Sequence, residues 1–345
     1  MTVKVGINGF GRIGRLIVRI WANALRRGEK LPWDIVAVNS RSNTKVKGHT
    51  LRYDTIYGRF DCEYDESTDE IHLPDIGKTI KCLVVNDPSE LPWKEMGVDI
   101  SVEATGKFTD RVGCQKQLDA GAKKVFISAP GKGDGPDLTV VYGINHKLYD
   151  PSKHAIISNA SCTTNCLAPM AKVLNDNLGI EAGLMVTIHA YTHTQNLLDN
   201  SHKDLRRARA AACNLIPTTT GAAKAVGLVI PELKGKLTGF AIRVPTPTVS
   251  FVDLTCMVKK ETDENEVKML FKEAAEGPMK GIIYYETEPT VSSDHEGTRY
   301  SAIFDSEFCH VMGGKLVKCI GWYDNEWGYT EALNMMLTHM VEKGI

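Results

Sequence analysis

Cys162 and His189 carry the side chains that covalent catalysis on a carbonyl group requires. Cys162 lies in S-N-A-S-C-T-T-N-C, just before the apolar run A-P-M-A-K-V-L, which predicts a helix beginning close to the cysteine. The positive end of a helix dipole lowers the pKa of a thiol, and a thiolate there could attack an aldehyde. His189 ends the run G-L-M-V-T-I-H and is the candidate general base. Taken alone, each residue at such a place is more often structural than catalytic.

Cys166, in the same stretch, raises the alternative of a metal site. A zinc site needs a matching pair of Cys or His ligands at a characteristic spacing elsewhere in the chain. No such pair follows. We therefore expect no bound metal.

Cations and hydroxyls suited to phosphate groups follow the histidine. Arg207 lies in the basic run D-L-R-R-A-R, and Arg243 is a single cation in an apolar, strand-like run. Thr220 and Gly221 belong to P-T-T-T-G-A-A-K-A, where hydroxyls precede a predicted helix whose N-terminus favours anions. A solvated face or an ion-pair network is the usual alternative for the basic run. Capture of small phosphates is the better functional interpretation.

The turn G-F-G-R-I-G follows a strand-like run and opens a predicted helix, which is the context of a dinucleotide fingerprint. Gly9 permits the tight turn, Gly11 lets the backbone approach a pyrophosphate, and Gly14 lets helix and strand pack closely. A glycine-rich turn that only packs is the alternative. The context favours dinucleotide binding.

The strand that follows lacks the acidic residue that NAD binding favours at its C-terminal end. Asp34 begins this strand, whereas its end carries Ser40 and Arg41. A carboxylate would accept hydrogen bonds from the ribose 2′-hydroxyl, while a serine beside an arginine suits a 2′-phosphate. The pattern predicts NADP rather than NAD. The alternative is that Ser40 is an exposed loop residue and that either cofactor binds.

The composition is that of a globular enzyme with more than one domain. The chain has 345 residues, 43% of them hydrophobic and 24% charged, with a net charge of −1, so no global field favours nucleic acid or an anionic membrane. No apolar run approaches the roughly 20 residues that a membrane span needs. The nine scattered cysteines favour a reducing compartment, so we expect a cytoplasmic enzyme.

The chain changes character near residue 160. In the first part, strand-like runs alternate with helical stretches, which predicts βαβ units and a parallel sheet, with an antiparallel ribbon at 60–90. The later part has long β-rich segments and predicts a mixed domain with a largely antiparallel sheet. The last segment is an amphipathic helix. Its apolar face consists of Leu333, Met336, Leu337 and Met340.

The motifs taken together resemble those of phosphorylating glyceraldehyde-3-phosphate dehydrogenase. G-I-N-G-F-G-R-I-G-R, A-S-C-T-T-N-C, I-H-A-Y-T, H-K-D-L-R-R-A-R-A-A, P-T-T-T-G-A-A-K-A, R-V-P-T-P and Y-D-N-E-W-G-Y occur in this order across nearly the whole chain. The resemblance implies a Rossmann-type cofactor domain over 1–160, a catalytic domain over 161–323, and a C-terminal helix over 324–345 that returns to the first domain. It also implies a homotetramer.

The resemblance also assigns roles to residues. Cys162 would form a thiohemiacetal with glyceraldehyde 3-phosphate, with His189 as the base, and a thioester cleaved by inorganic phosphate would follow hydride transfer. Thr192 and Arg243 match the site of the substrate phosphate. The site of the attacking phosphate is matched by Ser161, Thr163, Thr220 and Gly221, with Arg207 close to both. Cofactor contacts are matched by Arg12, Ile13, Thr105, Ser128 and Asn325.

Two departures from the family pattern support NADP. Members that prefer NAD resemble V-N-D where this chain has Ser40, and L-P where it has Asn200 and Ser201. NADP-using photosynthetic members are similar to this chain in having serine at the second place, on a loop that reaches the cofactor of a neighbouring subunit. Erythrose-4-phosphate dehydrogenase and a non-enzymatic binding protein on the same scaffold are the alternatives. The glycolytic or biosynthetic direction stays open.

Overall fold

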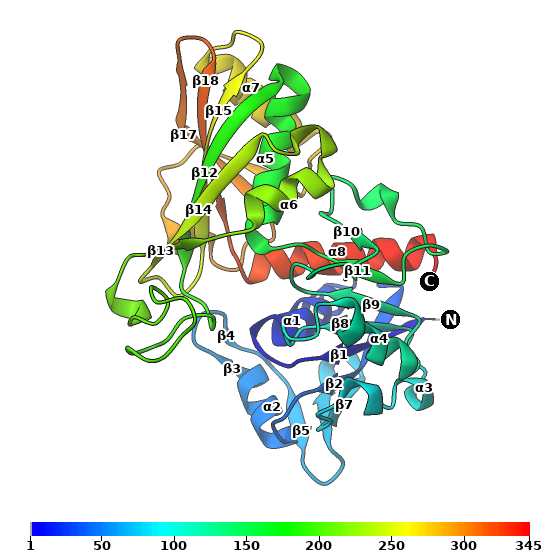
Figure 1. Cartoon of the computed structure of the whole chain (residues 1–345). Helices are drawn as coiled ribbons and strands as arrows, with labels where there is room; N and C mark the ends of the chain where they lie inside the picture. Colours follow the sequence, from blue (N-terminus) through cyan, green and yellow to red (C-terminus); the bar gives the residue numbers. More distant parts are fainter. Residues whose placement is uncertain (1) are drawn as a thin grey trace. The chain divides into compact units, whose positions relative to one another are not determined.

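The computed structural model describes residues 2–345, and the chain divides into two compact units (Figure 1). The first unit contains the residues up to Tyr142, together with His146–Ala160 and Leu333–Ile345. The second contains Gly143–Asn145 and Ser161–Ala332. None of the helices within residues 2–345 combines the length and the apolar character that a membrane crossing requires.

The first unit is built on a nine-stranded sheet with the order β10-β11-β9-β8-β1-β2-β7-β6-β5. The strands from β10 to β7 pair in parallel, and β5, β6 and β7 form an antiparallel ribbon at one edge. The strands are β1 (Val3–Asn8), β2 (Trp33–Asn39), β5 (Glu63–Asp65), β6 (Glu70–Leu73), β7 (Lys78–Leu83), β8 (Ile100–Glu103), β9 (Lys124–Ile127), β10 (Leu138–Thr139) and β11 (Ile156–Ser158). The parallel sheet and the edge ribbon confirm the predicted architecture of this part.

Helices connect these parallel strands, as βαβ units require. They are α1 (Arg12–Arg26), α2 (Thr44–Arg52), α3 (Trp93–Met96) and α4 (Arg111–Asp119), and a small ribbon of β3 (Tyr53–Asp54) and β4 (Gly58–Arg59) follows α2. Apolar residues of α1, including Ile17 and Trp21, pack with those of β1 in one core. The four apolar residues of the C-terminal segment, Leu333, Met336, Leu337 and Met340, are fully buried in the same core. Burial of each contributes roughly 1.5–3 kcal/mol.

The second unit is built on a seven-stranded sheet with the order β13-β14-β12-β15-β18-β17-β16. Its pairs are antiparallel except for β12 with β14 and β16 with β17, which confirms the largely antiparallel sheet predicted for this part. The strands are β12 (Ile180–Ala190), β13 (Ile216–Thr219), β14 (Leu237–Val244), β15 (Ser250–Val258), β16 (Ile283–Glu286), β17 (Ala302–Met312) and β18 (Leu316–Tyr323).

Three helices of the second unit, α5 (Cys162–Leu178), α6 (Ala222–Val229) and α7 (Glu264–Glu276), lie against this sheet (Figure 1). The last helix, α8 (Trp327–Lys343), begins in the second unit and belongs to the first from Leu333 onward. The helix therefore starts three residues after the segment boundary expected at 324. The turn before the helix is held by Asp324, whose carboxylate accepts hydrogen bonds from the backbone N–H groups of Glu326 and Trp327.

Candidate functional site

Cys162 is the first residue of α5, in the second unit. Ser161 caps this helix, since its hydroxyl oxygen accepts a hydrogen bond from the N–H of Thr164 at 3.1 Å. Such a cap fixes the first helical turn and with it the direction of the cysteine side chain. Of the nine cysteines, only Cys162 and Cys213 are not buried. The predicted nucleophile thus lies at a capped helix terminus, where the residue as a whole is partly exposed although its sulfur is largely enclosed.

His189 lies next to this cysteine from the end of β12. Its Nε2 is 3.4 Å from Cys162 Sγ, which is within reach for proton transfer between thiol and imidazole. Burial and the positive charge of Arg243 lower the pKa of His189 to about 3. The pair is therefore a neutral thiol beside a neutral imidazole, in which Nε2 can act as a base.

The backbone N–H groups at the start of α5 act to lower the pKa of Cys162, as the sequence predicts, but the net shift is upward. Burial raises the pKa of this thiol, and this effect outweighs the opposing influence of Arg243 and of hydrogen bonds from Thr163. A helix terminus and a nearby cation favour the thiolate only where burial of the sulfur does not outweigh them. The sequence reveals the helix terminus, but it does not reveal how deeply the sulfur is enclosed.

Arg243 contacts the other nitrogen of the imidazole. It lies on β14 directly opposite His189 in the parallel β12–β14 pair. Its Nη1 is 2.7 Å from His189 Nδ1 and donates to the carbonyl oxygen of Ala190 at 2.9 Å. Nδ1 can accept this N–H of Arg243, in which case the proton of the neutral ring is on Nε2. In the other tautomer Nδ1 carries the proton and donates to the same carbonyl at 2.7 Å, which leaves the lone pair of Nε2 toward the sulfur. In both tautomers the charge of Arg243 opposes a second positive charge on the ring.

A tyrosine outside the predicted set connects the two elements that carry Cys162 and His189. The hydroxyl of Tyr323, at the end of β18, lies 2.9 Å from the hydroxyls of both Thr163 and Thr187. All three residues are buried. This bridge ties the first turn of α5 to β12, the strand that carries His189. Sequence reasoning missed Tyr323 and Thr187, although Tyr323 opens the motif Y-D-N-E-W-G-Y.

A second connection runs from β12 to Asn325, a predicted cofactor residue. The N–H of Ala190 donates to the hydroxyl of Ser250, and this hydroxyl donates to Asn325 Oδ1, each at 3.0 Å. Ser250 was not predicted, because nothing in its local sequence distinguishes it from any other strand serine. The structure places Asn325 directly behind the strand end that carries His189.

The predicted phosphate residues of the second unit include two arginines near His189 and a glycine at a helix start. Arg207 donates from Nε to the hydroxyl of Thr218 at 2.9 Å, and its charge lowers the pKa of both His189 and Arg243. Arg207, Arg243 and His189 are thus close in space. Gly221 caps α6, and a Cβ built on it would meet nothing within 4 Å.

The hydroxyls of the remaining predicted phosphate residues have contacts within their own segments or with Tyr323. Thr220 Oγ1 accepts from the N–H of Ala222, and Thr192 Oγ1 is 2.8 Å from Thr194 Oγ1. The hydroxyl of Ser161 is 2.7 Å from that of Thr164. Thr163 is the residue engaged by Tyr323. Thr192 is in a different loop from the helix-capping residues.

The three glycines of the first unit have different surroundings. A Cβ on Gly9, whose φ is +109°, would lie 2.4 Å from the backbone of Ala104, and a Cβ on Gly14 would lie 2.1 Å from the oxygen of Gly9. Both are required by packing. A Cβ on Gly11, which caps α1, would meet nothing within 4 Å. The open space at the helix N-terminus fits the phosphates of a dinucleotide.

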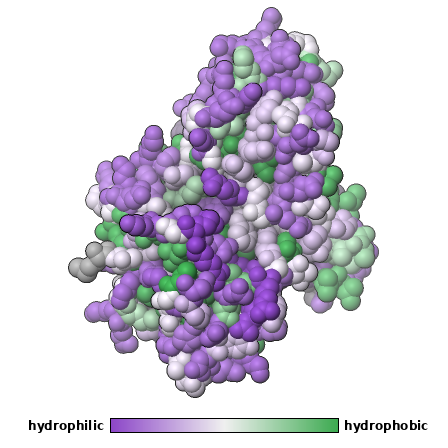
Figure 2. All heavy atoms as spheres, turned by 180° about the vertical axis from the view of Figure 1, so that it is seen from behind, coloured by the Kyte–Doolittle hydropathy of each residue, from purple (hydrophilic) through white to green (hydrophobic). Residues whose placement is uncertain are grey.

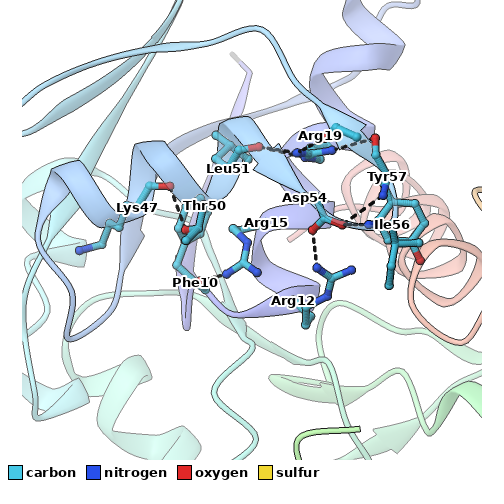
Figure 3. Close-up of polar contacts among 11 residues, drawn as sticks. Phe10, Arg12, Arg15, Arg19, Lys47, Thr50, Leu51, Asp54, Ile56 and Tyr57 are labelled. Carbon is cyan, nitrogen blue, oxygen red and sulfur yellow. Dashed lines mark hydrogen bonds and ion pairs between the residues drawn. The ribbon is translucent and has the colours of Figure 1, made fainter. Parts of the chain in front are cut away.

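Arg12, the first residue of α1, is held by the loop after α2 (Figure 3). Its guanidinium forms an ion pair with Asp54 and lies 5.6 Å from the ring centroid of Tyr57. The backbone N–H groups of Tyr57 and Ile56 also donate to Asp54. These donors, with Arg12, lower the pKa of Asp54 although its burial acts in the opposite direction. Arg12 is fixed beside the glycine turn.

Thr105 and Ser128 are grouped around a carboxylate that sequence reasoning missed. The N–H of Thr105 donates to Glu103 Oε1 at 2.7 Å, and the hydroxyl of Ser128 donates to the backbone oxygen of Glu103 at 3.0 Å. Glu103 is buried at the end of β8, and burial raises its pKa. Ile13, the remaining predicted contact, packs against the core beside α1.

The end of β2 carries Ser40 and Arg41, which the sequence predicts to contact the 2′-position of the cofactor's ribose. Ser40 donates from its N–H to the oxygen of Leu83 at 3.2 Å, and its hydroxyl is 2.9 Å from that of Ser42. Arg41 is exposed. Asp34 lies at the opposite end of the strand, where it pairs with Lys78. Ser201 belongs to the second unit, on an exposed loop.

Comparison with known proteins assigns the chain to a family. The glyceraldehyde 3-phosphate dehydrogenase NAD binding domain matches residues 3–111, and the C-terminal domain of the same enzyme matches residues 161–325. Glyceraldehyde-3-phosphate dehydrogenase of Geobacillus stearothermophilus is 52% identical over 346 residues, which cover 100% of both chains. The chain belongs to the glyceraldehyde-3-phosphate dehydrogenase family.

Two further members of the glyceraldehyde-3-phosphate dehydrogenase family match over almost their whole length. Glyceraldehyde-3-phosphate dehydrogenase of Streptomyces coelicolor is 54% identical over 334 residues, 96% of this chain and 97% of the relative. Glyceraldehyde-3-phosphate dehydrogenase 2 of a Nostoc strain is 52% identical over 343 residues, 99% of this chain and 100% of the relative. These matches confirm the family that the motifs indicated. Within residues 2–345 the structure contains no cluster of three or more side chains suited to hold a metal.

Proposed function

We propose that the chain is a phosphorylating glyceraldehyde-3-phosphate dehydrogenase that interconverts glyceraldehyde 3-phosphate, with inorganic phosphate, and 1,3-bisphosphoglycerate. The observation that carries the proposal is the arrangement of Cys162, His189 and Arg243. A nucleophile lies 3.4 Å from Nε2 of a neutral imidazole, which is a base in the tautomer with its proton on Nδ1, and a cation lies on the other side of that ring. This is the set of groups that acyl transfer from an aldehyde needs.

The first step forms a bond between Cys162 Sγ and the aldehyde carbon. His189 Nε2 accepts the thiol proton and returns it to the former carbonyl oxygen, which gives a thiohemiacetal. His189 then takes the hydroxyl proton as the hydride leaves, and a thioester remains on Sγ. Attack by an oxygen of hydrogen phosphate breaks the C–S bond and releases the acyl phosphate. His189 returns its proton to the leaving sulfur, which restores the thiol, and the proton of the hydrogen phosphate passes to solvent. The nicotinamide ring, when bound, supplies the hydride acceptor.

Arg243 and Arg207 are proposed to hold the phosphate groups, together with Thr192, Ser161, Thr163, Thr220 and Gly221. Arg243 supports this assignment most directly, because its Nε is buried and has no hydrogen-bond partner in residues 2–345. A buried donor without an acceptor is costly, and an anion at this place would satisfy it. The open N-terminus of α6 at Gly221 offers further N–H groups.

The proposed cofactor is NADP, with NAD as a weaker substitute. Support comes from the end of β2, where Ser40 and the exposed Arg41 stand in place of a carboxylate. Gly9, Gly11, Gly14, Arg12, Ile13, Thr105 and Ser128 in the first unit, with Asn325 in the second, are proposed as further cofactor contacts. The open space over Gly11 suits the pyrophosphate.

The proposed assembly is a homotetramer, in which Ser201 reaches the cofactor of a neighbouring subunit. Leu184, Phe240 and Met257 are exposed on neighbouring strands β12, β14 and β15. Leu197, Leu198 and Leu205 are more than 70% exposed on the loop that carries Ser201. Figure 2 shows apolar residues gathered at the edge of the surface where Figure 1 places this loop. Apolar surfaces of this kind are typical of subunit contacts.

The deciding experiment is kcat/KM for glyceraldehyde 3-phosphate with phosphate present, measured with NADP and with NAD in parallel. Higher kcat/KM with NADP supports the whole proposal. Higher kcat/KM with NAD keeps the reaction and rejects the cofactor assignment. No turnover with either cofactor rejects the reaction, and erythrose 4-phosphate is then the next substrate. Sedimentation equilibrium gives the subunit number.

A further inference from the structure

Lys47 is a buried lysine in the first unit that the proposed chemistry does not use. It lies in α2, one turn after Asn43, the residue that caps this helix. Its side chain is only 1% exposed. Its Nζ donates to the backbone oxygen of Ser42, and also to that of Ser40 at 3.4 Å. Figure 3 shows the ammonium directed away from the Arg12–Asp54 contact.

The charge of Lys47 is not balanced by a carboxylate at contact distance. Its hydrogen-bond acceptors among residues 2–345 are the two backbone oxygens. Asp69, a carboxylate whose charge acts on Lys47, already accepts a hydrogen bond from Thr44. Burial lowers the pKa of Lys47, and the first turn of a helix, where N–H dipoles are positive, is an unfavourable place for a cation. A neutral hydrogen-bond donor could bind the backbone oxygens of Ser40 and Ser42 at a lower cost in free energy.

The two contacts of Lys47 fix the direction of two peptide groups. In a trans peptide the N–H points opposite to the C=O of the preceding residue. Because the oxygens of Ser40 and Ser42 face Lys47, the N–H groups of Arg41 and Asn43 face away from it. Neither N–H has a hydrogen-bond partner in residues 2–345, and both residues are exposed. Two free donors thus flank the paired hydroxyls of Ser40 and Ser42.

We propose that Lys47 is a positioning residue for the 2′-phosphate of the adenosine ribose in NADP. It turns the N–H groups of Arg41 and Asn43 outward, and its charge adds positive potential behind the loop 40–43. This inference rests on the proposed use of NADP. Backbone N–H groups over a fixed positive charge make an anion-binding concavity, and the exposed guanidinium of Arg41 completes it. An aspartate at position 40 would oppose the same anion.

The experiment compares Lys47→Gln, which keeps a donor but removes the charge, with Lys47→Arg, which keeps the charge. Lys45→Gln is the matched control, since Lys45 lies on the same helix turn and is exposed. The readouts are kcat/KM with NADP and with NAD, and the dissociation constants of 2′-AMP and 5′-AMP by calorimetry. Circular dichroism and the melting temperature check that each variant folds.

We expect Lys47→Gln to lower the ratio of kcat/KM for NADP to that for NAD about tenfold, and to weaken 2′-AMP binding more than 5′-AMP binding. Lys47→Arg and Lys45→Gln should keep a ratio near that of the unsubstituted protein. If Lys47→Gln lowers kcat/KM equally with both cofactors and weakens both nucleotides equally, Lys47 only stabilises the loop. That result would overturn the inference. If Lys47→Gln does not fold, a changed ratio in Lys47→Arg would also contradict it.

The unsubstituted protein separates this inference from the proposed cofactor. If it prefers NAD and binds 2′-AMP no better than 5′-AMP, the cofactor proposal fails, and the role of Lys47 fails with it. If it prefers NADP while Lys47→Gln keeps that preference, only the role of Lys47 fails. The two failures therefore give different results in the same set of measurements.

Discussion

Arg243 Nη1 lies 2.7 Å from His189 Nδ1, while the Nε2 of the same ring lies 3.4 Å from Cys162 Sγ. The imidazole is thus held between a cation and a nucleophile. A neighbouring positive charge makes a second proton on the ring unfavourable. The arrangement keeps the imidazole of His189 neutral, and it places a cation on the side of the ring away from the sulfur of Cys162.

Replacing Arg243 should change both the pKa of His189 and the binding of the substrate. We expect Arg243→Gln to raise the pKa of His189, because a positive charge that lowers it is removed. The loss of a charged contact to phosphate should raise KM for the phosphorylated aldehyde about 10- to 100-fold. The pH dependence of kcat/KM and NMR titration of the histidine ring measure the two effects. The control is Arg206→Gln, which removes the charge of an exposed arginine next to Arg207 in the sequence.

Cys162 should be the only cysteine whose alkylation depends on substrate. Seven of the nine cysteines are buried, and Cys213 is exposed but distant in sequence from every predicted site residue of α5. We expect iodoacetamide to label Cys162 and Cys213, and substrate to protect Cys162 alone. Cys162→Ser should lose about a thousandfold or more in kcat, while Cys213→Ser should keep full activity. Peptide mass spectrometry reads the labels, and retained turnover in Cys162→Ser would contradict the assignment.

Two glycines of one turn should respond differently to alanine. A Cβ at Gly14 meets the backbone oxygen of Gly9 at 2.1 Å, so Gly14→Ala should lower the free energy of unfolding by about 1–3 kcal/mol. Gly11→Ala meets no protein atom and should change stability by less than about 0.5 kcal/mol. It should nevertheless raise KM for the cofactor, because the methyl group occupies the phosphate space. Urea unfolding and steady-state kinetics test the pair.

His146 should make the protein less stable in mild acid. Burial, with the positive charges of His339 and Lys147, lowers the pKa of His146 to about 4 from 6.5. Between these values the unfolded chain binds more protons than the folded one, so stability falls as the pH drops from about 6.5 to about 4. His146→Gln should reduce this loss, measured as the urea midpoint at pH 7 and pH 5. An unchanged loss would exclude His146 as its source.

The sequence predicts those features that depend on local spacing. The parallel sheet, the three glycines with their separate tasks, and the placement of Cys162 at a helix start all follow from short motifs. The bridge from Tyr323 to Thr163 and Thr187 does not, because it joins segments far apart in the chain. Glu103 and Lys47 were missed for a different reason, since only burial distinguishes them from surface charges.

Ser40→Asp should reverse the cofactor preference if the end of β2 reads the 2′-phosphate. The new carboxylate would accept hydrogen bonds from a ribose 2′-hydroxyl and repel a 2′-phosphate. We expect kcat/KM with NADP to fall about 10- to 100-fold and that with NAD to hold or rise. Ser42→Ala is the matched control, because it removes the hydroxyl partner of Ser40 at 2.9 Å without adding charge. A similar fall with both cofactors would mean that the aspartate disturbs the loop, and NADP selectivity would then have to reside elsewhere.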